Sequence, residues 1–192
     1  MLSYREASDT ADAVNRDHKR FQVSIEPAFN HRGFNRVLKD WEEARRGDLL
    51  PARPQFDPMN YPRLMPYMGL YEPVESGDDW RFRLHGTGLV EMFGHDDTGK
   101  AMFADSVFTG DVRDAFTRYF ELVYNWPQPV WFSGWISYWR DGSSVPYRGI
   151  SLPLSLDNRT LSQNLQLFHF MKSRAIRKTT DTAKPWLAEA TG

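Results

Sequence analysis

The chain has 192 residues, a formal net charge of −1 and no cysteine. The near-neutral charge gives no general attraction to nucleic acid or to an anionic membrane. The lack of cysteine excludes disulfides, thiolate nucleophiles, cysteine-based zinc sites and flavin photochemistry through a thiol adduct.

The N-terminal segment lacks the apolar core of a signal peptide. No stretch reaches the roughly 18 apolar residues of a membrane span. A cytoplasmic protein with one domain and flanking tails is therefore expected.

Residues 1–33 form a polar, weakly patterned N-terminal segment. The first firm element is a helix over 34–46, in which Phe34, Leu38 and Trp41 share one apolar stripe. Such a helix packs across its own domain or pairs with a copy in a partner. The three residues are therefore candidate contacts of a dimer or of another protein.

A proline-rich loop over 49–66 follows, with apolar residues interleaved, and is read as rigid and docked. Strands are predicted over 68–74 and 80–85. In the second strand the alternation places Phe82 and Leu84 on one face, as expected for the core side of a sheet.

The second half of the chain predicts a short helix over 88–93 and a long amphipathic helix over 111–124. A meander of three strands then follows, over 130–139, 145–154 and 161–171. The basic C-terminal residues 172–192 are expected to form a flexible, solvated tail rather than a nucleic-acid site.

This element order predicts an α+β domain over 34–171. It consists of a leading N-terminal helix and a five-stranded antiparallel sheet, with helices inserted between the second and third strands. Hairpin-linked strands favour an antiparallel sheet, and the inserted helices are expected to cover one of its faces.

Several short motifs accompany that order. They are Leu50-Pro51, Arg53, Phe56-Asp57-Pro58, Pro62, Leu64, Pro66, Arg83-Leu84, Gly86-Thr87, Gly94, Asp96, Thr98-Gly99, Tyr147 and Leu152-Pro153-Leu154-Ser155. With them, the sequence resembles a family of stand-alone bacterial PAS-like proteins over about residues 37–170. The resemblance implies a PAS-like fold and a role in sensing a ligand or signal, and it supplies no catalytic residues. His85 departs from the pattern, which has a small apolar residue there.

Several residues are of types that could bind a cofactor, a metal or a ligand. The long helix contains no histidine, which argues against haem, and His95-Asp96-Asp97 is read as a turn rather than a metal site. Trp135 and Tyr138 are read as core or sheet-surface residues, with stacking on a non-covalent flavin as the alternative. Arg148 would clamp a carboxylate ligand if its strand face were inward, and would be exposed in the other register.

The first functional hypothesis is a sensory or regulatory domain that binds a small molecule between the sheet and the inserted helices. The candidate ligand contacts are Phe82, Leu84, Met92, Phe116, Tyr119 and Arg148. With no output domain of its own, the chain would act as a homodimer or through a signalling partner.

Two alternatives remain. One is a ligand-free dimerisation module whose own aromatic residues fill the core. The other is a small cone-fold enzyme that uses His85 or His95 as a base, for which the sequence places no carboxylate partner. No catalytic motif is present, so a non-enzymatic protein is expected.

Overall fold

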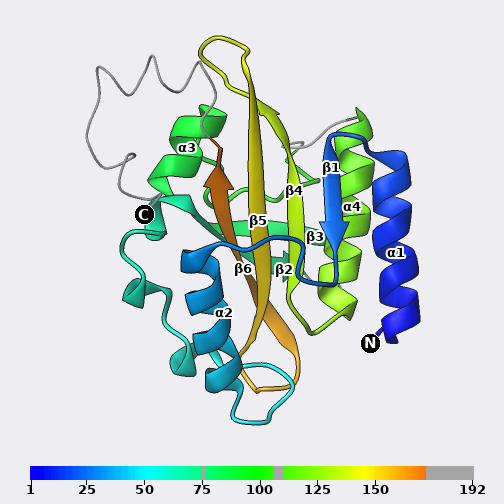
Figure 1. Cartoon of the computed structure of the whole chain (residues 1–192), viewed down its shortest axis with the longest axis vertical. Coiled ribbons are helices and arrows are strands. Elements are labelled where there is room, and N and C mark those ends of the chain that lie inside the picture. Colours follow the sequence, from blue (N-terminus) through cyan, green and yellow to red (C-terminus); the bar gives the residue numbers. More distant parts are fainter. Residues whose placement is uncertain (75–76, 106–109, 172–192) are drawn as a thin grey trace.

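The computed structural model describes residues 1–74, 77–105 and 110–171, and it shows a sheet with helices on both faces (Figure 1). All strand pairs are antiparallel, in the order β1-β4-β5-β6-β2-β3. The strands are β1 (Phe21–Ser24), β2 (Met68–Val74), β3 (Asp79–His85), β4 (Val130–Ser137), β5 (Ser144–Ser155) and β6 (Leu161–Phe170). The helices are α1 (Tyr4–Asp17), α2 (Arg32–Arg45), α3 (Thr87–Phe93) and α4 (Gly110–Asn125).

The α+β class and the insertion of α3 and α4 between β3 and β4 are confirmed. The predicted strand count is corrected from five to six, because β1 adds to the edge of the sheet beside β4. The docked loop over 49–66 contains short 3-10 turns rather than a strand or helix. The expected tail over 172–192 lies outside the described residues.

The N-terminal segment is part of the fold. Ser3 caps α1 through a capping box with Glu6, and α1 packs on both β1 and α4. The Asn15 side chain donates to the Val23 carbonyl at 2.9 Å and accepts from the Val23 amide at 2.8 Å. These bonds occupy backbone groups of an edge strand that would otherwise be open to pairing.

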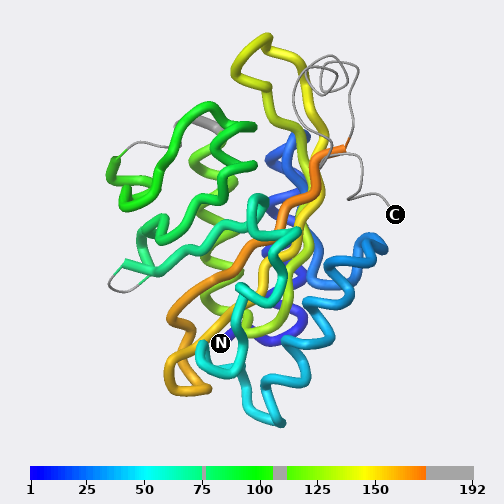
Figure 2. The backbone as a smooth tube through the Cα atoms, turned by 90° about the vertical axis from the view of Figure 1, so that its left-hand side faces the viewer, coloured from blue at the N-terminus to red at the C-terminus, as the bar shows by residue number. Residues whose placement is uncertain are grey.

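Helix α2 covers the sheet face opposite α3 and α4, which Figure 2 shows with α2 on the right and the green helices on the left. Phe34 and Trp41 are buried and Leu38 is half-buried. The Trp41 indole N–H donates to the Pro153 carbonyl at 2.8 Å. The apolar stripe is therefore used inside the chain. Packing across its own domain, one of the two roles predicted for this helix, is what the structure shows. A contact of the stripe with a dimer partner stays a prediction.

Coverage on both faces explains why β5 is buried almost continuously from Gly149 to Ser155. On one face, Ile150, Leu152 and Leu154 lie in the core on the α2 side. On the other face, the Ser151 hydroxyl bonds Tyr119 of α4. The sheet is thus the central layer of three, whereas the sequence predicted only one covered face.

Candidate functional site

A pocket of about 400 Å³ lies between the sheet and helices α3 and α4. Half of its lining residues are Phe, Tyr or Trp. The sheet contributes Tyr71, Phe82, Phe132, Tyr147, Gln166 and Phe168. The helices contribute Phe93, Val112, Ala115, Phe116, Tyr119 and Phe120. The α1–β1 connection contributes His18 and Arg20, and β1 contributes Phe21. The volume falls within the range of small-molecule sites, about 300–1,000 Å³.

Glycines make room for the aromatic floor of this pocket. A Cβ added at Gly149 would stand 2.1 Å from the Phe132 ring, and one at Gly134 would stand 2.7 Å from the Tyr147 hydroxyl. Both rings therefore lie against bare backbone, where any other residue would push them away from the sheet. We therefore expect the depth of the pocket to depend on these two strand glycines.

A β-bulge sets the polar side of the pocket. Leu70 pairs with Leu84, but the next residue, Tyr71, pairs with Phe82, so Arg83 is an extra residue in β3. The bulge breaks the alternation. Leu84 points outward and is 41% exposed, whereas His85 is 9% exposed and lines the pocket.

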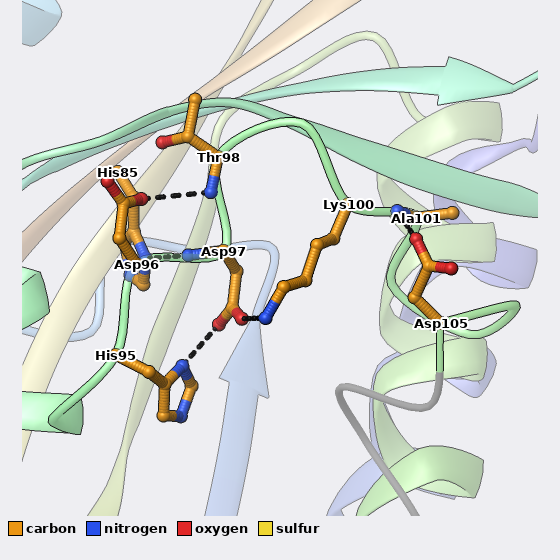
Figure 3. A network of polar contacts seen from close by, with 8 residues as sticks. All are labelled: His85, His95, Asp96, Asp97, Thr98, Lys100, Ala101 and Asp105. Carbon is orange, nitrogen blue, oxygen red and sulfur yellow. Dashed lines mark hydrogen bonds and ion pairs between the residues drawn. The ribbon is translucent and has the colours of Figure 1, made fainter.

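A buried carboxylate stands beside His85 (Figure 3). The Asp97 side chain is 3% exposed, and it accepts from Lys100 Nζ at 2.9 Å and pairs with His95 Nδ1 at 2.7 Å. The Asp97 backbone N–H donates to His85 Nδ1 at 3.4 Å. Asp96 instead closes a local turn by accepting the Thr98 amide at 2.9 Å. The 95–97 segment is a turn, as expected, and it also supplies two pocket residues, His95 and Asp97.

A hydrogen-bonded network of buried residues supports α4 on the sheet. The Tyr119 hydroxyl bonds Ser151 and accepts from Gln166 Nε2, and Asn164 Nδ2 donates to Ser151. Burial raises the pKa of Tyr119 well above its ordinary value, so the phenol stays protonated. The network fixes the orientation of Tyr119 and Gln166, which both line the pocket.

Three of the six candidate ligand contacts meet in the pocket, namely Phe82, Phe116 and Tyr119. The other three lie outside it. Leu84 is turned outward by the bulge. Met92 packs with Tyr138 and Val145 in a separate cluster.

Arg148 is the third residue outside the pocket. It lies exposed on the α2 side of the sheet, with its guanidinium 5.5 Å from the centre of the Phe29 ring. An inward Arg148 clamp is thus excluded by the register of β5. Trp135 does line the pocket, at 52% exposure, while Tyr138, the other residue considered for stacking, does not.

Sequence reasoning missed much of the polar side and the floor. Alternation in the strand over 80–85 places His85 on the face opposite Phe82, and the turn predicted at His95-Asp96-Asp97 gives no sign that the Asp97 carboxylate is buried. Tyr71, Phe132, Tyr147 and Phe168 were not among the candidates, although each is an aromatic residue in a predicted strand. The in-strand glycines at 134 and 149 were the available signal, because a glycine inside a strand marks a close approach of another group.

Three histidines predict how stability depends on pH. Burial lowers the pKa of His31, His85 and His169. The positive charge of Arg148 lowers the pKa of His169 further, and His169 in turn lowers that of His31. The unfolded chain therefore binds more protons than the folded one below the ordinary histidine value of about 6.5. The free energy of unfolding should be level from about pH 8 to 6.5 and fall between about pH 6.5 and 5, by at most about 1.4 kcal/mol per pH unit for each histidine.

Urea denaturation across this range would measure the fall. His31 Nδ1 accepts the Phe34 amide at 3.3 Å as the N-cap of α2, so protonation removes a cap. Replacement of His31 with asparagine keeps a cap acceptor without a titrating group, and it should flatten the curve. An unchanged slope in His31→Asn would contradict the assignment of this proton to His31.

Within the described residues there is no group of three or more His, Cys, Asp or Glu side chains that could hold a metal ion. The described helices include none with the length and apolarity to cross a membrane. Comparison with curated proteins and with solved structures gives no significant match. A family profile described as the PAS domain matches residues 29–168. The match spans most of the sheet and both inserted helices, and the chain accordingly belongs to the PAS domain family.

Proposed function

We propose that this chain is a sensory PAS domain that binds a small molecule in the pocket between the sheet and helices α3 and α4. Membership of the PAS domain family supports a sensory or regulatory role in general. The observation that carries the more specific proposal is the pocket itself, which is mainly apolar, is about 400 Å³ in volume and has a few polar lining residues.

The N-terminal unit, which consists of α1 and β1, lies where it could respond to a ligand in the pocket. Phe21 of β1 lines the pocket, stacks on Phe116 of α4 with ring centres 4.8 Å apart, and meets Tyr119 edge-on at 5.2 Å. A ligand that moves these rings would alter the packing of α1 and β1 on α4. Occupancy would then shift the chain between two arrangements of its N-terminal unit, which a partner could distinguish.

The proposal is tested with native mass spectrometry of freshly purified protein and with equilibrium dialysis against 2-ethylnaphthalene as an apolar probe. We expect either a non-covalent mass or probe binding. Val112 lines the pocket and is 46% exposed, so Val112→Trp should block the entrance without crowding the core. Glu121→Trp places the same side chain on an exposed, non-lining position of α4 and is the matched control.

Loss of binding in Val112→Trp with retention in Glu121→Trp would support the proposal. The absence of any bound mass together with no probe binding would contradict it. That result would favour a ligand-free interaction module, the second candidate function. Such a module would use exposed apolar side chains such as Leu84, Trp135 and Trp139 in place of the buried α2 stripe.

A further inference from the structure

The polar groups of the pocket are confined to a few places, and their charges are largely balanced. Asp97 is the only acidic residue that lines the pocket in the described chain, and its carboxylate already has Lys100 and His95 as partners. Arg20, the one lining arginine or lysine among these residues, is exposed. A charged ligand group in the interior would therefore lose hydration without gaining a buried, unpaired counter-charge. The interior favours an uncharged ligand.

The shape and lining of the interior favour flat rings. Phe132 and Tyr147 lie against the glycine backbone of the floor, and Phe116, Phe120 and Phe168 stand around them. Phe132 meets Phe168 edge-on with ring centres 5.0 Å apart. Faces and edges of aromatic rings bind further aromatic rings in offset or edge-on contacts, beyond what apolar area alone contributes.

His85 supplies one directed hydrogen-bond donor to this apolar space. Its Nδ1 accepts the Asp97 amide, and burial lowers its pKa, so the ring is neutral and carries its hydrogen on Nε2. No residue of the described chain accepts a hydrogen bond from Nε2. The rings of Phe82 and Phe93 flank the imidazole, with centres 5.6 and 5.7 Å away. A donor in an aromatic setting selects a ligand that brings an acceptor.

We propose that the ligand is an uncharged planar aromatic molecule with a carbonyl-type oxygen, which accepts a hydrogen bond from His85 Nε2. This inference rests on the proposed function and adds the ligand class to it. The β-bulge at Arg83 is the structural origin of the specificity, because it turns His85 rather than Leu84 into the pocket.

The test compares three probes of similar size by equilibrium dialysis at pH 8: 2-acetylnaphthalene, 2-ethylnaphthalene and 2-naphthoate. The first carries a neutral acceptor, the second carries none and the third is an anion. A net hydrogen bond of about 0.5–1.5 kcal/mol corresponds to a preference for the ketone over the ethyl compound of about two- to tenfold. The carboxylate should bind more weakly than the ketone.

The variant His85→Leu should remove the preference for the ketone, so that the two neutral probes bind with equal affinity. His85→Gln retains an N–H donor and should keep part of the preference. Equal binding of the ketone and the ethyl compound by the natural chain would overturn the ligand class. This comparison uses the natural chain alone, so it does not depend on whether a variant folds. Tightest binding of 2-naphthoate, or an undiminished preference in His85→Leu, would overturn it as well.

The result also separates the two proposals. Binding of both neutral probes without a preference would leave the sensory pocket in place and remove only the role of His85. If none of the three compounds binds and the purified protein carries no extra mass, the proposed function fails and the ligand class fails with it.

Discussion

Replacement of Trp41 with alanine is expected to lower the free energy of unfolding by about 4 kcal/mol, within the range for loss of a large buried aromatic side chain. Trp41 has no exposed surface, and Arg45 lies with its guanidinium 5.2 Å from the centre of the indole ring. The substitution also leaves the Pro153 carbonyl without its side-chain donor. Urea denaturation followed by circular dichroism would measure the change.

Two control variants show how much of this loss of stability comes from the indole N–H and how much from substitution in α2 as such. Trp41→Phe keeps an aromatic ring but removes the N–H, so it should cost less than Trp41→Ala. Lys39→Ala removes an exposed side chain of the same helix, whose ion pair with Glu43 is at the surface, and should change stability by less than about 0.5 kcal/mol.

Light scattering on Trp41→Ala distinguishes folding from assembly. A variant that kept its stability but changed from dimer to monomer would show that the α2 stripe serves a partner. That outcome would contradict the packing of α2 on the sheet of its own chain.

The fold was predictable where local patterns were strong. β2 begins and ends at the predicted residues, and α4 is one residue longer at each end than the predicted helix. β1 was missed because a four-residue strand has no signal of its own and forms only by pairing with β4. The second covered face was missed because the α2 stripe is equally consistent with packing on the chain's own sheet and with packing on a partner helix. The spacing of apolar residues is the same in both cases.

The candidate site was predictable in part. Phe116 and Tyr119 follow from the helical stripe of α4, and Phe82 from alternation in β3. Alternation fails at the following residues because a β-bulge depends on the partner strand, and one extra residue exchanges the faces of Leu84 and His85. Asp97 is buried only because Lys100 and His95 are close enough to compensate its charge, which a turn-like sequence does not reveal.

The variant Gly149→Ala is expected to damage stability and binding together. Gly149 faces Phe132, and an added Cβ would stand 2.1 Å from that ring and 2.6 Å from the Leu167 carbonyl oxygen. Overpacking of a core of this density costs about 1–3 kcal/mol, since the neighbours have to move. The Phe132 ring is the movable neighbour and lines the pocket, so it should be pushed into the ligand space. We expect lower stability in urea and at least tenfold weaker binding of 2-ethylnaphthalene.

A double-mutant cycle identifies the cause. Phe132→Leu replaces the ring by a smaller side chain, so in that background Gly149→Ala should cost less stability than in the natural chain. The cost that remains belongs to the Leu167 carbonyl, which cannot move without disturbing the β5–β6 pairing. Additive effects of the two substitutions on stability would show that the Phe132 ring is not what opposes a side chain at position 149. Unchanged probe binding in Gly149→Ala would show that the glycine serves strand pairing alone, and that the depth of the pocket has another origin.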